Sequence, residues 1–304
     1  MKYRRFFLYT FWYFSLFLLL IAPGGCRQVD NKEEAVGKGL LTGKIDTTGV
    51  LIKYNDNLFS LPSPYEAVYM ISEQNLSVDA ELLNSPDHHS RYNTSFKKAL
   101  NIGIYGTDMG YLHIFNHDEE LSTYFKAIRN LSRDLGLHEA LSEREIKLMK
   151  NSLTAGDSTI FYLTRTYRRF DAYLKQSNRR KTGALILAGG WVESNYLLSQ
   201  TILKHPERPL VNRLGEQKHV LDNLIELLSS YYYDADKYTQ LIDAMVDIAY
   251  EFDGVIYNYY YKDPLVKEDE KLTVIRSTSN VVISEYHLRT IAEKLSNLRN
   301  QIIS

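Results

Sequence analysis

Asp108 and Glu193 are the residues whose setting in the sequence points most directly to chemistry. Each lies in an apolar stretch of helical periodicity, about one turn after small residues, in ALNIGIYGTDMGYL (residues 99–112) and ALILAGGWVESNYL (residues 184–197). A carboxylate in a buried helix is costly unless it is paired or hydrogen-bonded. We therefore expect each acid to have a partner inside the fold.

The candidate partners are aromatic, amide, imidazole and guanidinium groups. Arg165 and Arg168, in TRTYRRF, supply positive charge from another predicted helix. The remaining candidates are Tyr105, Tyr111, His113, Trp191, Asn195 and Tyr196. Three interpretations stay open: an internal network that fixes helix register, a cluster that binds a polar ligand or a metal, and a catalytic acid pair.

The two stretches align with each other at a constant offset. Asp108 then meets Glu193, and the tyrosine that follows each acid meets a tyrosine. This match predicts a divergent internal duplication, with halves at about 60–137 and 140–262. If the halves pack about a pseudo-two-fold axis, both acids face one interior.

Glycines interrupt both stretches where a helix would favour alanine. Gly189 and Gly190 each cost a helix about 1 kcal/mol relative to alanine, and Gly103 and Gly106 interrupt the other stretch. A residue without a side chain lets another backbone come close, and the dispersion energy gained can offset the lost helix propensity. We predict close backbone packing at all four glycines.

Apolar residues recur at helical spacing along most of residues 55–304. Ser142 and Glu145 form a capping-box pattern at one predicted helix start. One segment, KLTVI, has the composition of a short strand, and no alternating series of strands and turns accompanies it. The pattern predicts a single all-α domain, a bundle of about eight to ten helices whose last helix covers about 284–302.

The first 26 residues resemble the signal of a bacterial lipoprotein. Basic Lys2, Arg4 and Arg5 precede an uncharged apolar run over residues 6–22, and the small residues of PGGC lead directly to Cys26. The resemblance implies export, removal of residues 1–25 and lipidation of the cysteine. Because Cys26 is the only cysteine in the chain, an internal disulfide is excluded.

An uncleaved N-terminal anchor is the alternative, since residues 6–22 come near the short limit for a transmembrane helix. Residues 27–45 are polar and lack periodicity, which predicts a flexible tether over residues 26–54. The lipoprotein resemblance implies an outer-membrane location in the bacterial envelope, with the domain facing the periplasm or the cell surface.

The body of the chain also carries a resemblance. PSPYEAVYMI, YNTSFKKALNIGIYGTDMGYL and GGWVESNYLL together are similar to a family of poorly characterised helical lipoproteins of the Bacteroidetes type. The similarity covers most of residues 60–260. The resemblance implies an all-helical fold and a location in the cell envelope. It implies no enzymatic activity.

The composition of the chain and the motifs that it lacks argue against several classes of function. With 36 basic and 37 acidic residues and no basic stripe, the chain is not expected to bind nucleic acid. It lacks the zinc-protease motif, a nucleophile elbow, a phosphate-binding glycine loop and a dinucleotide fingerprint, so we expect no cofactor. His88 and His89 in PDHHS fit a solvated turn better than a metal site.

We therefore expect a membrane-anchored, non-enzymatic helical module that binds or interacts with a protein or a small polar ligand. One alternative is a ligand-sensing extracytoplasmic domain on an uncleaved anchor. The least favoured interpretation is a hydrolase whose acid pair is Asp108 and Glu193.

Overall fold

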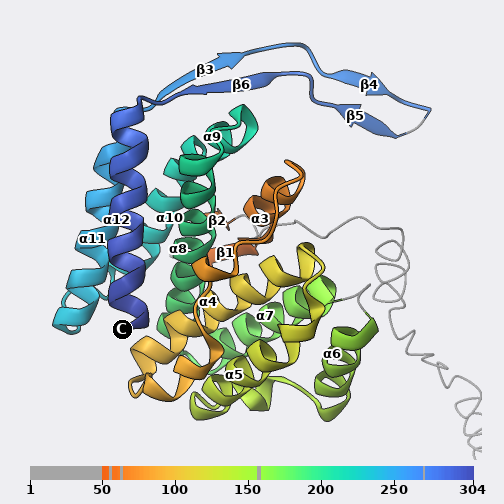
Figure 1. Cartoon of the computed structure of the whole chain (residues 1–304), viewed down its shortest axis with the longest axis vertical. Helices are drawn as coiled ribbons and strands as arrows, with labels where there is room; N and C mark the ends of the chain where they lie inside the picture. Colours follow the sequence, from red (N-terminus) through yellow and green to blue (C-terminus); the bar gives the residue numbers. More distant parts are fainter. Residues whose placement is uncertain (1–49, 55–56, 62–63, 156–158, 270) are drawn as a thin grey trace, which may run out of the picture. The chain divides into compact units, whose positions relative to one another are not determined.

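The computed structural model describes residues 50–54, 57–61, 64–155, 159–269 and 271–304, all within the unit Gly43–Ser304 (Figure 1). The predicted signal segment and Cys26 lie outside the described residues. None of the helices in the described ranges combines the length and the apolar character that a membrane crossing requires.

Ten α-helices make up most of the described chain, which confirms the predicted all-α bundle. In chain order they are α3 (Pro64–Ser72), α4 (Ser95–Ile114), α5 (Leu121–Asp134), α6 (Glu143–Ala155), α7 (Thr159–Gln176), α8 (Arg180–Lys204), α9 (Arg208–Gly215), α10 (Gln217–Ser229), α11 (Asp236–Phe252) and α12 (Glu285–Ile303). Single 3-10 turns connect some of them: η1 (Ala80–Leu82), η2 (Pro86–Arg91), η3 (Asp118–Glu120) and η4 (Leu137–Ala140).

Helices α4 and α8 pack along each other at the centre, and other helices surround them (Figure 1). α4 contacts α3, α5, α7 and α12, while α8 contacts α3, α7, α9, α10 and α12. Every residue from 99 to 112 in α4 is buried. A helix enclosed on all sides needs no polar face, which explains why these two sequences lack the one-sided apolar stripe of outer helices such as α5.

Glycines allow α4 and α8 to meet backbone to backbone. A Cβ added at Gly189 would lie 2.7 Å from the carbonyl carbon of Leu100, and one at Gly103 would lie 2.5 Å from the backbone nitrogen of Gly190. Real Cβ atoms do not come so close to a neighbouring backbone. The predicted close packing is confirmed for this pair of helices, whereas the duplication itself stays a prediction.

The prediction of backbone packing was wrong for Gly106. The group that packs against this glycine is a side chain of another helix and not a backbone. A Cβ there would lie 2.6 Å from Cζ of the Tyr167 ring. The Tyr167 hydroxyl uses the space to donate a hydrogen bond to the carbonyl oxygen of Ile102 at 2.9 Å. Gly106 therefore makes room for a half-buried tyrosine that joins α7 to α4.

The start of α6 follows its predicted chemistry. The backbone N–H of Glu145 donates to Oγ of Ser142 at 3.2 Å, and the backbone N–H of Ser142 donates to Oε2 of Glu145 at 2.9 Å. Two N–H groups that the helix leaves unpaired are thus satisfied reciprocally. The capping box is confirmed.

Residues 256–282 form an antiparallel arm of four strands, of which the sequence analysis predicted only the one in KLTVI. β3 (Ile256–Tyr260) pairs with β6 (Thr278–Val282), and β4 (Leu265–Lys267) pairs with β5 (Leu272–Val274). The apolar spacing of α11 continues in the sequence as far as residue 256, but the helix itself ends at Phe252. Gly254 follows, and IYNYY then has the aromatic, β-branched composition of a strand. β5 lies within KLTVI, the segment predicted as a strand.

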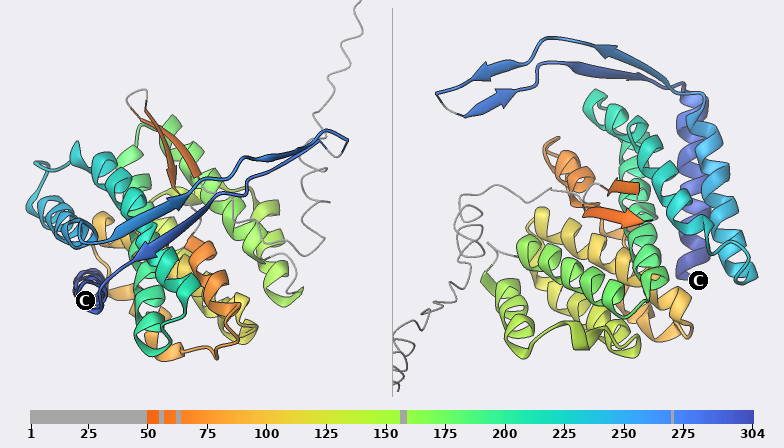
Figure 2. Two further views of the ribbon diagram at one scale, coloured as in Figure 1. Left: turned by 90° about the horizontal axis from the view of Figure 1, so that it is seen from above. Right: turned by 180° about the vertical axis from the view of Figure 1, so that it is seen from behind.

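The arm leaves the helices between α11 and α12 and passes α9, as both views of Figure 2 show. A second hairpin pairs β1 (Val50–Tyr54) with β2 (Asn57–Leu61). β1 falls inside residues 26–54, so the end of the predicted tether is in fact a strand. Its sequence, VLIKY, is rich in the β-branched and aromatic residues that favour extended backbone.

Candidate functional site

Asp108 and Glu193 meet inside the protein, on the facing helices α4 and α8. Both side chains are 0% exposed, and their carboxyl groups are close enough to share a hydrogen bond. The expected meeting of the two acids in one interior is confirmed. A ligand-binding role for them stays a prediction.

The positive partner of the acids is Arg299, which comes from α12. Its Nε donates to Oε2 of Glu193 at 2.8 Å, and its Nη2 donates to Oε1 of the same carboxylate at 2.9 Å. Nη2 also donates to the carbonyl oxygen of Leu82 at 2.7 Å, and the guanidinium carbon lies 4.4 Å from the ring centroid of Tyr196. A planar guanidinium suits this combination of bidentate pairing and stacking, which lysine cannot reproduce.

Asp108 is the acid of the cluster to which Arg299 makes no hydrogen bond among those that link the described residues. Its Oδ2 accepts a hydrogen bond from the backbone N–H of Asn84 at 3.2 Å, while Oδ1 has no donor among the described residues. Burial raises the pKa of Asp108, and the neighbouring charge of Glu193 raises it further, against a smaller opposing effect of Arg299. A protonated Asp108 can donate to the Glu193 carboxylate, which leaves one anion and one cation in the interior.

Two buried asparagines extend the cluster toward η2 and the end of α12. The side-chain amide of Asn84 donates to the Tyr92 hydroxyl at 3.0 Å and to Oδ1 of Asn101 at 3.3 Å. The amide of Asn101 donates in turn to the carbonyl oxygen of Ile302 at 3.3 Å. Sequence analysis missed both asparagines, although an amide within the buried run 99–112 is a signal of an internal hydrogen bond.

The arginines predicted as partners lie elsewhere. Arg165 pairs with Glu145 of α6, with 3.6 Å between Nε and Oε1, and Arg168 is exposed on α7. The prediction failed because TRTYRRF turns these side chains toward the surface of α7. Arg299 carried a signal that was overlooked: it lies four residues after Leu295, inside the apolar stripe of the last helix.

The predicted aromatic partners are divided among several places. Tyr196 joins the cluster through Arg299, whereas the Tyr105 hydroxyl donates to the carbonyl oxygen of Ser85 at 2.9 Å. Trp191 is buried, and its Nε1 has no hydrogen-bond partner among the described residues. The hydroxyl of Tyr111 accepts a hydrogen bond from the backbone N–H of Asp79 at 3.1 Å.

The other polar candidates make local bonds. Nδ1 of His113 lies 2.8 Å from Oδ1 of Asp118. The amide of Asn195 donates to the carbonyl oxygen of Trp191, one turn earlier, at 2.8 Å. The PDHHS histidines lie in η2 and are half-buried, and within the described ranges no three His, Cys, Asp or Glu side chains are grouped so as to hold a metal.

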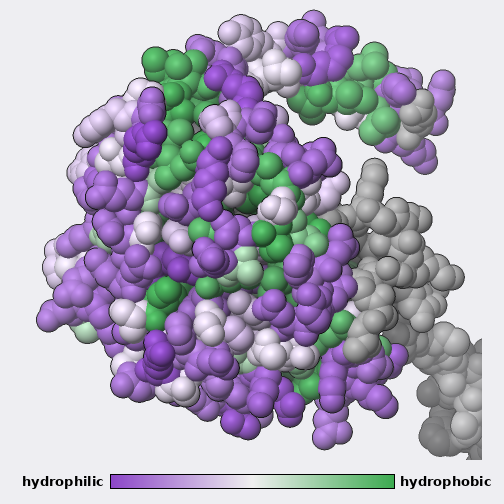
Figure 3. Space-filling view, viewed as in Figure 1, coloured by the Kyte–Doolittle hydropathy of each residue, from purple (hydrophilic) through white to green (hydrophobic). Residues whose placement is uncertain are grey.

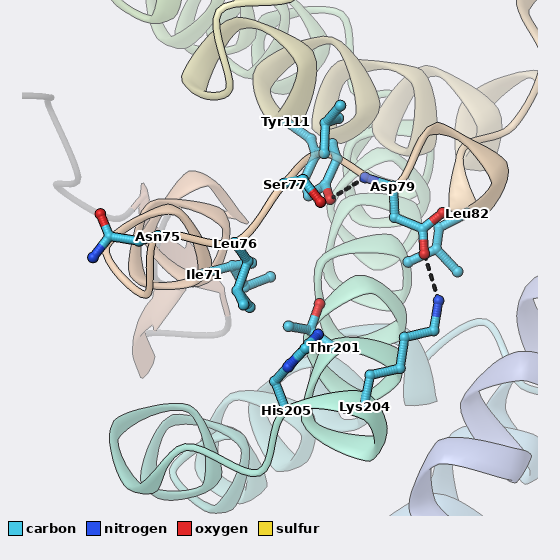
Figure 4. Close-up of a pocket in the computed structure, with 11 residues that line it drawn as sticks. Ile71, Asn75, Leu76, Ser77, Asp79, Leu82, Tyr111, Thr201, Lys204 and His205 are labelled. Atoms are coloured by element: carbon cyan, nitrogen blue, oxygen red, sulfur yellow. Dashed lines mark hydrogen bonds and ion pairs between the residues drawn. The ribbon is translucent and has the colours of Figure 1, made fainter.

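A cavity of about 540 Å³ opens beside the cluster, between α3, α4 and the end of α8 (Figure 4). Its polar edge carries an ion pair in which Nζ of Lys204 lies 2.5 Å from Oδ2 of Asp79, and the Tyr111 hydroxyl lies next to it. The complete lining is Ile71, Asn75, Leu76, Ser77, Val78, Asp79, Leu82, Tyr111, Thr201, Lys204 and His205.

Residues 79–84 connect the cavity to the buried cluster. At one end the Asp79 carboxylate forms the ion pair at the cavity edge. At the other end, the carbonyl oxygen of Leu82 accepts from Arg299 and the N–H of Asn84 donates to Asp108. A single six-residue segment is thus held by charges on both of its sides.

Comparisons with known proteins add no relative: no family model, no curated protein and no solved structure matches this chain.

Proposed function

We propose that this protein is a lipid-anchored, non-enzymatic binding module of the bacterial envelope, and that it binds a small polar ligand in the cavity between α3, α4 and α8. The lipid anchor rests on the basic residues, apolar run and PGGC of the first 26 residues. The binding role rests on one observation, the cavity itself. Its volume of about 540 Å³ falls within the range of about 300–1,000 Å³ that is common for small-molecule sites.

The lining of the cavity favours a ligand with both an acceptor and a donor. Lys204 and Asp79 offer a cation and an anion at the same edge, and the Tyr111 hydroxyl lies beside them. Figure 4 shows Ile71 and Leu76 on the side of the cavity away from Asp79 and Lys204. Polar groups on an otherwise apolar wall fix the orientation of a ligand and so provide specificity.

The geometry of the acid cluster argues against the hydrolase alternative. A catalytic acid or base must come within hydrogen-bond reach of its substrate. Asp108 and Glu193 have no exposed surface, and both carboxylate oxygens of Glu193 bond to Arg299. The cluster therefore acts on the fold: it holds α12 and residues 79–84 against α8, and it supports the cavity wall from behind.

Blocking the cavity tests the binding role. Thr201→Trp places a large ring in the cavity, while Leu203→Trp adds the same ring on the exposed side of α8, outside the lining. The full chain is screened by thermal unfolding against amino acids, dicarboxylates, amino sugars and nucleosides. A ligand at 100 times its Kd stabilises the folded state by about 2.7 kcal/mol.

We expect a stabilising compound to raise the Tm of the wild type and of Leu203→Trp, and to leave Thr201→Trp unchanged. The cavity is wrong as the binding site if both variants respond alike, or if no compound in the panel shifts the wild type.

The anchor has its own test. Cys26→Ser removes the thiol that would carry lipid, so we expect the loss of the acyl mass, with the protein either left as the uncleaved precursor or released into the aqueous phase of a detergent partition. Acyl chains supply about 0.8 kcal/mol per buried CH₂, and several chains are needed for stable anchoring. Unchanged mass and unchanged partitioning would assign membrane attachment to an uncleaved N-terminal segment.

A further inference from the structure

Apolar side chains are concentrated on the arm, residues 256–282. Of the fifteen large hydrophobic side chains that are exposed in the described ranges, ten belong to the arm. They are Ile256, Tyr257, Tyr259, Tyr260, Tyr261, Leu265, Val266, Leu272, Ile275 and Val282. Figure 3 shows apolar surface on the outer part of the arm, away from the helices. A patch of this many exposed apolar side chains on one part of a protein surface is typical of an interaction site.

Only the base of the arm is fastened to the helices. Val281 is fully buried, and its backbone N–H donates to Oδ1 of Asn212 at 3.2 Å. The Tyr257 hydroxyl donates to the carbonyl oxygen of Gly215 at 2.7 Å. Further out, the opposed strands β4 and β5 leave Leu265 and Leu272 each 44% exposed. The outer half therefore lacks the helix contacts that hold the base.

A two-stranded ribbon of this kind is marginal in water by itself. Stable sheets have three or more strands or lie against a helix. β4 pairs only with β5 in the described chain, so each strand keeps one open edge of N–H and C=O groups. Added strands would bury the apolar side chains and would pair the N–H and C=O groups of the open edges.

We propose that the arm joins two copies of this chain. The segment 262–268 of one copy, which contains β4, pairs antiparallel with the same segment of a second copy, about a two-fold axis at Leu265, and the two ribbons form a four-stranded sheet. Such an isologous contact uses one surface twice, as closed dimers require. Exposed Leu265 then lies against Leu265 of the second copy and loses its contact with water.

The charges along this strand select the register. With Leu265 on the axis, Asp263 lies opposite Lys267 of the second copy, and Lys262 lies opposite Glu268. Symmetry repeats each pair, so the sheet gains four cross-strand pairs of opposite charge. Pro264 lies between residues whose N–H groups bond across the axis, at a position where its missing N–H costs no hydrogen bond.

The other edge of the arm is unsuited to the same contact. Residues 271–282 contain Lys271 and Arg276 and no acid, so two such edges would bring like charges together. Like charges directly opposite each other destabilise a sheet. The β3–β4 edge is therefore the one that fits a second copy.

Cysteine trapping tests the axis. In the full chain with Cys26→Ser, purified in detergent, Leu265→Cys places the two thiols opposite each other, and we expect a disulfide-linked dimer on mild oxidation. Leu272→Cys is the matched control, with the same exposure of the native side chain. Its thiol would lie three strand spacings of about 4.8 Å from its counterpart, too far for a disulfide.

Charge reversal tests the register by sedimentation equilibrium of the same protein. Lys267→Glu should raise the dimer Kd about tenfold or more, because it faces Asp263 of the second copy at two places. Lys271→Glu, in the turn before β5, should leave the Kd unchanged, and Asp263→Lys combined with Lys267→Asp should restore it. A monomer at every concentration, equal cross-linking of the two cysteine variants, or binding of the monomer to phosphatidylcholine vesicles through the arm would overturn the proposal.

Discussion

Arg299 and Glu193, 106 positions apart in the sequence, form two parallel hydrogen bonds in the interior of the helical body. The pair joins α12 to α8, and beside it lies Asp108 of α4, whose pKa is raised by burial and by the charge of Glu193. Three helices from distant parts of the chain are thus fixed by a single neutralised cluster. A buried ion pair adds little net stability by itself, but removing one partner leaves a charge in a medium that cannot solvate it.

Loss of the cation should be costly. We expect Arg299→Met, which keeps most of the side-chain volume, to lower the free energy of unfolding by about 3–5 kcal/mol, because Glu193 becomes an unpaired buried anion. Arg289→Met on the same helix removes an exposed pair with Glu285 and should change stability by less than about 0.5 kcal/mol. Urea unfolding of both variants measures the difference, and similar values would show that the pair does not anchor α12.

Asp108→Asn should change how stability depends on pH. The raised pKa of Asp108 contributes stability that is complete below the unfolded value of 3.8 and is lost as the pH rises through the folded value. Asparagine imitates the protonated acid at every pH. The variant should therefore equal the wild type near pH 4 and gain on it as the pH rises from the unfolded value of 3.8 to the folded value, in unfolding experiments above pH 4.

Asp134→Asn is a control, because its effect on stability should change with pH in the opposite direction. The hydrogen bond from Lys98 lowers the pKa of Asp134, so its contribution is present above the unfolded value and is lost in acid. This variant should lose stability relative to the wild type as the pH rises. Parallel pH profiles for the two substitutions would contradict the assignment of the shared proton to Asp108.

Gly189→Ala should destabilise the protein by about 1–3 kcal/mol or more, because the new methyl group would force α8 away from Leu100. Gly183→Ala is the matched change in the same helix. There the nearest atom to a new Cβ is 3.7 Å away, in the Leu174 side chain, and the loss of glycine freedom should stabilise the fold by about 0.4–1 kcal/mol. Thermal unfolding should move in opposite directions for the two variants.

Gly106→Ala should destabilise through Tyr167, not through a backbone clash. The Tyr167→Phe change removes the hydroxyl that fills the glycine gap, at a cost of about 1 kcal/mol for the lost hydrogen bond to Ile102. In the double variant part of the clash disappears, so its cost should be smaller than the sum of the two single costs. Strict additivity would mean that the two residues do not touch.

The features that the sequence predicted well are those with a local physical cause. Two glycines in the middle of an apolar helix have few explanations besides close packing, and a carboxylate in such a helix requires a partner. Ser142 and Glu145 act within one turn, so their spacing is sufficient evidence. Each of these inferences needs only a few neighbouring residues.

The identity of the partner was beyond this kind of inference. Arg299 meets Glu193 only because α12 packs along α8, a fact of topology that spacing does not encode. Arg165 looked equivalent in the sequence, and its position on α7 decided otherwise. The arm was missed for another reason: apolar residues continued the helical spacing of α11 past Gly254, and the period changed from helix to strand within a few residues.

The cluster also sets the order in which the chain can fold as it is made. During synthesis Asp108 and Glu193 emerge long before Arg299, and until the cation arrives the space between α4 and α8 would have to enclose an unbalanced negative charge. The centre of the bundle must therefore close late, through a contact of large sequence separation. Until α12 has been made, Asp108 and Glu193 can avoid an uncompensated charge in the interior only by staying in contact with water.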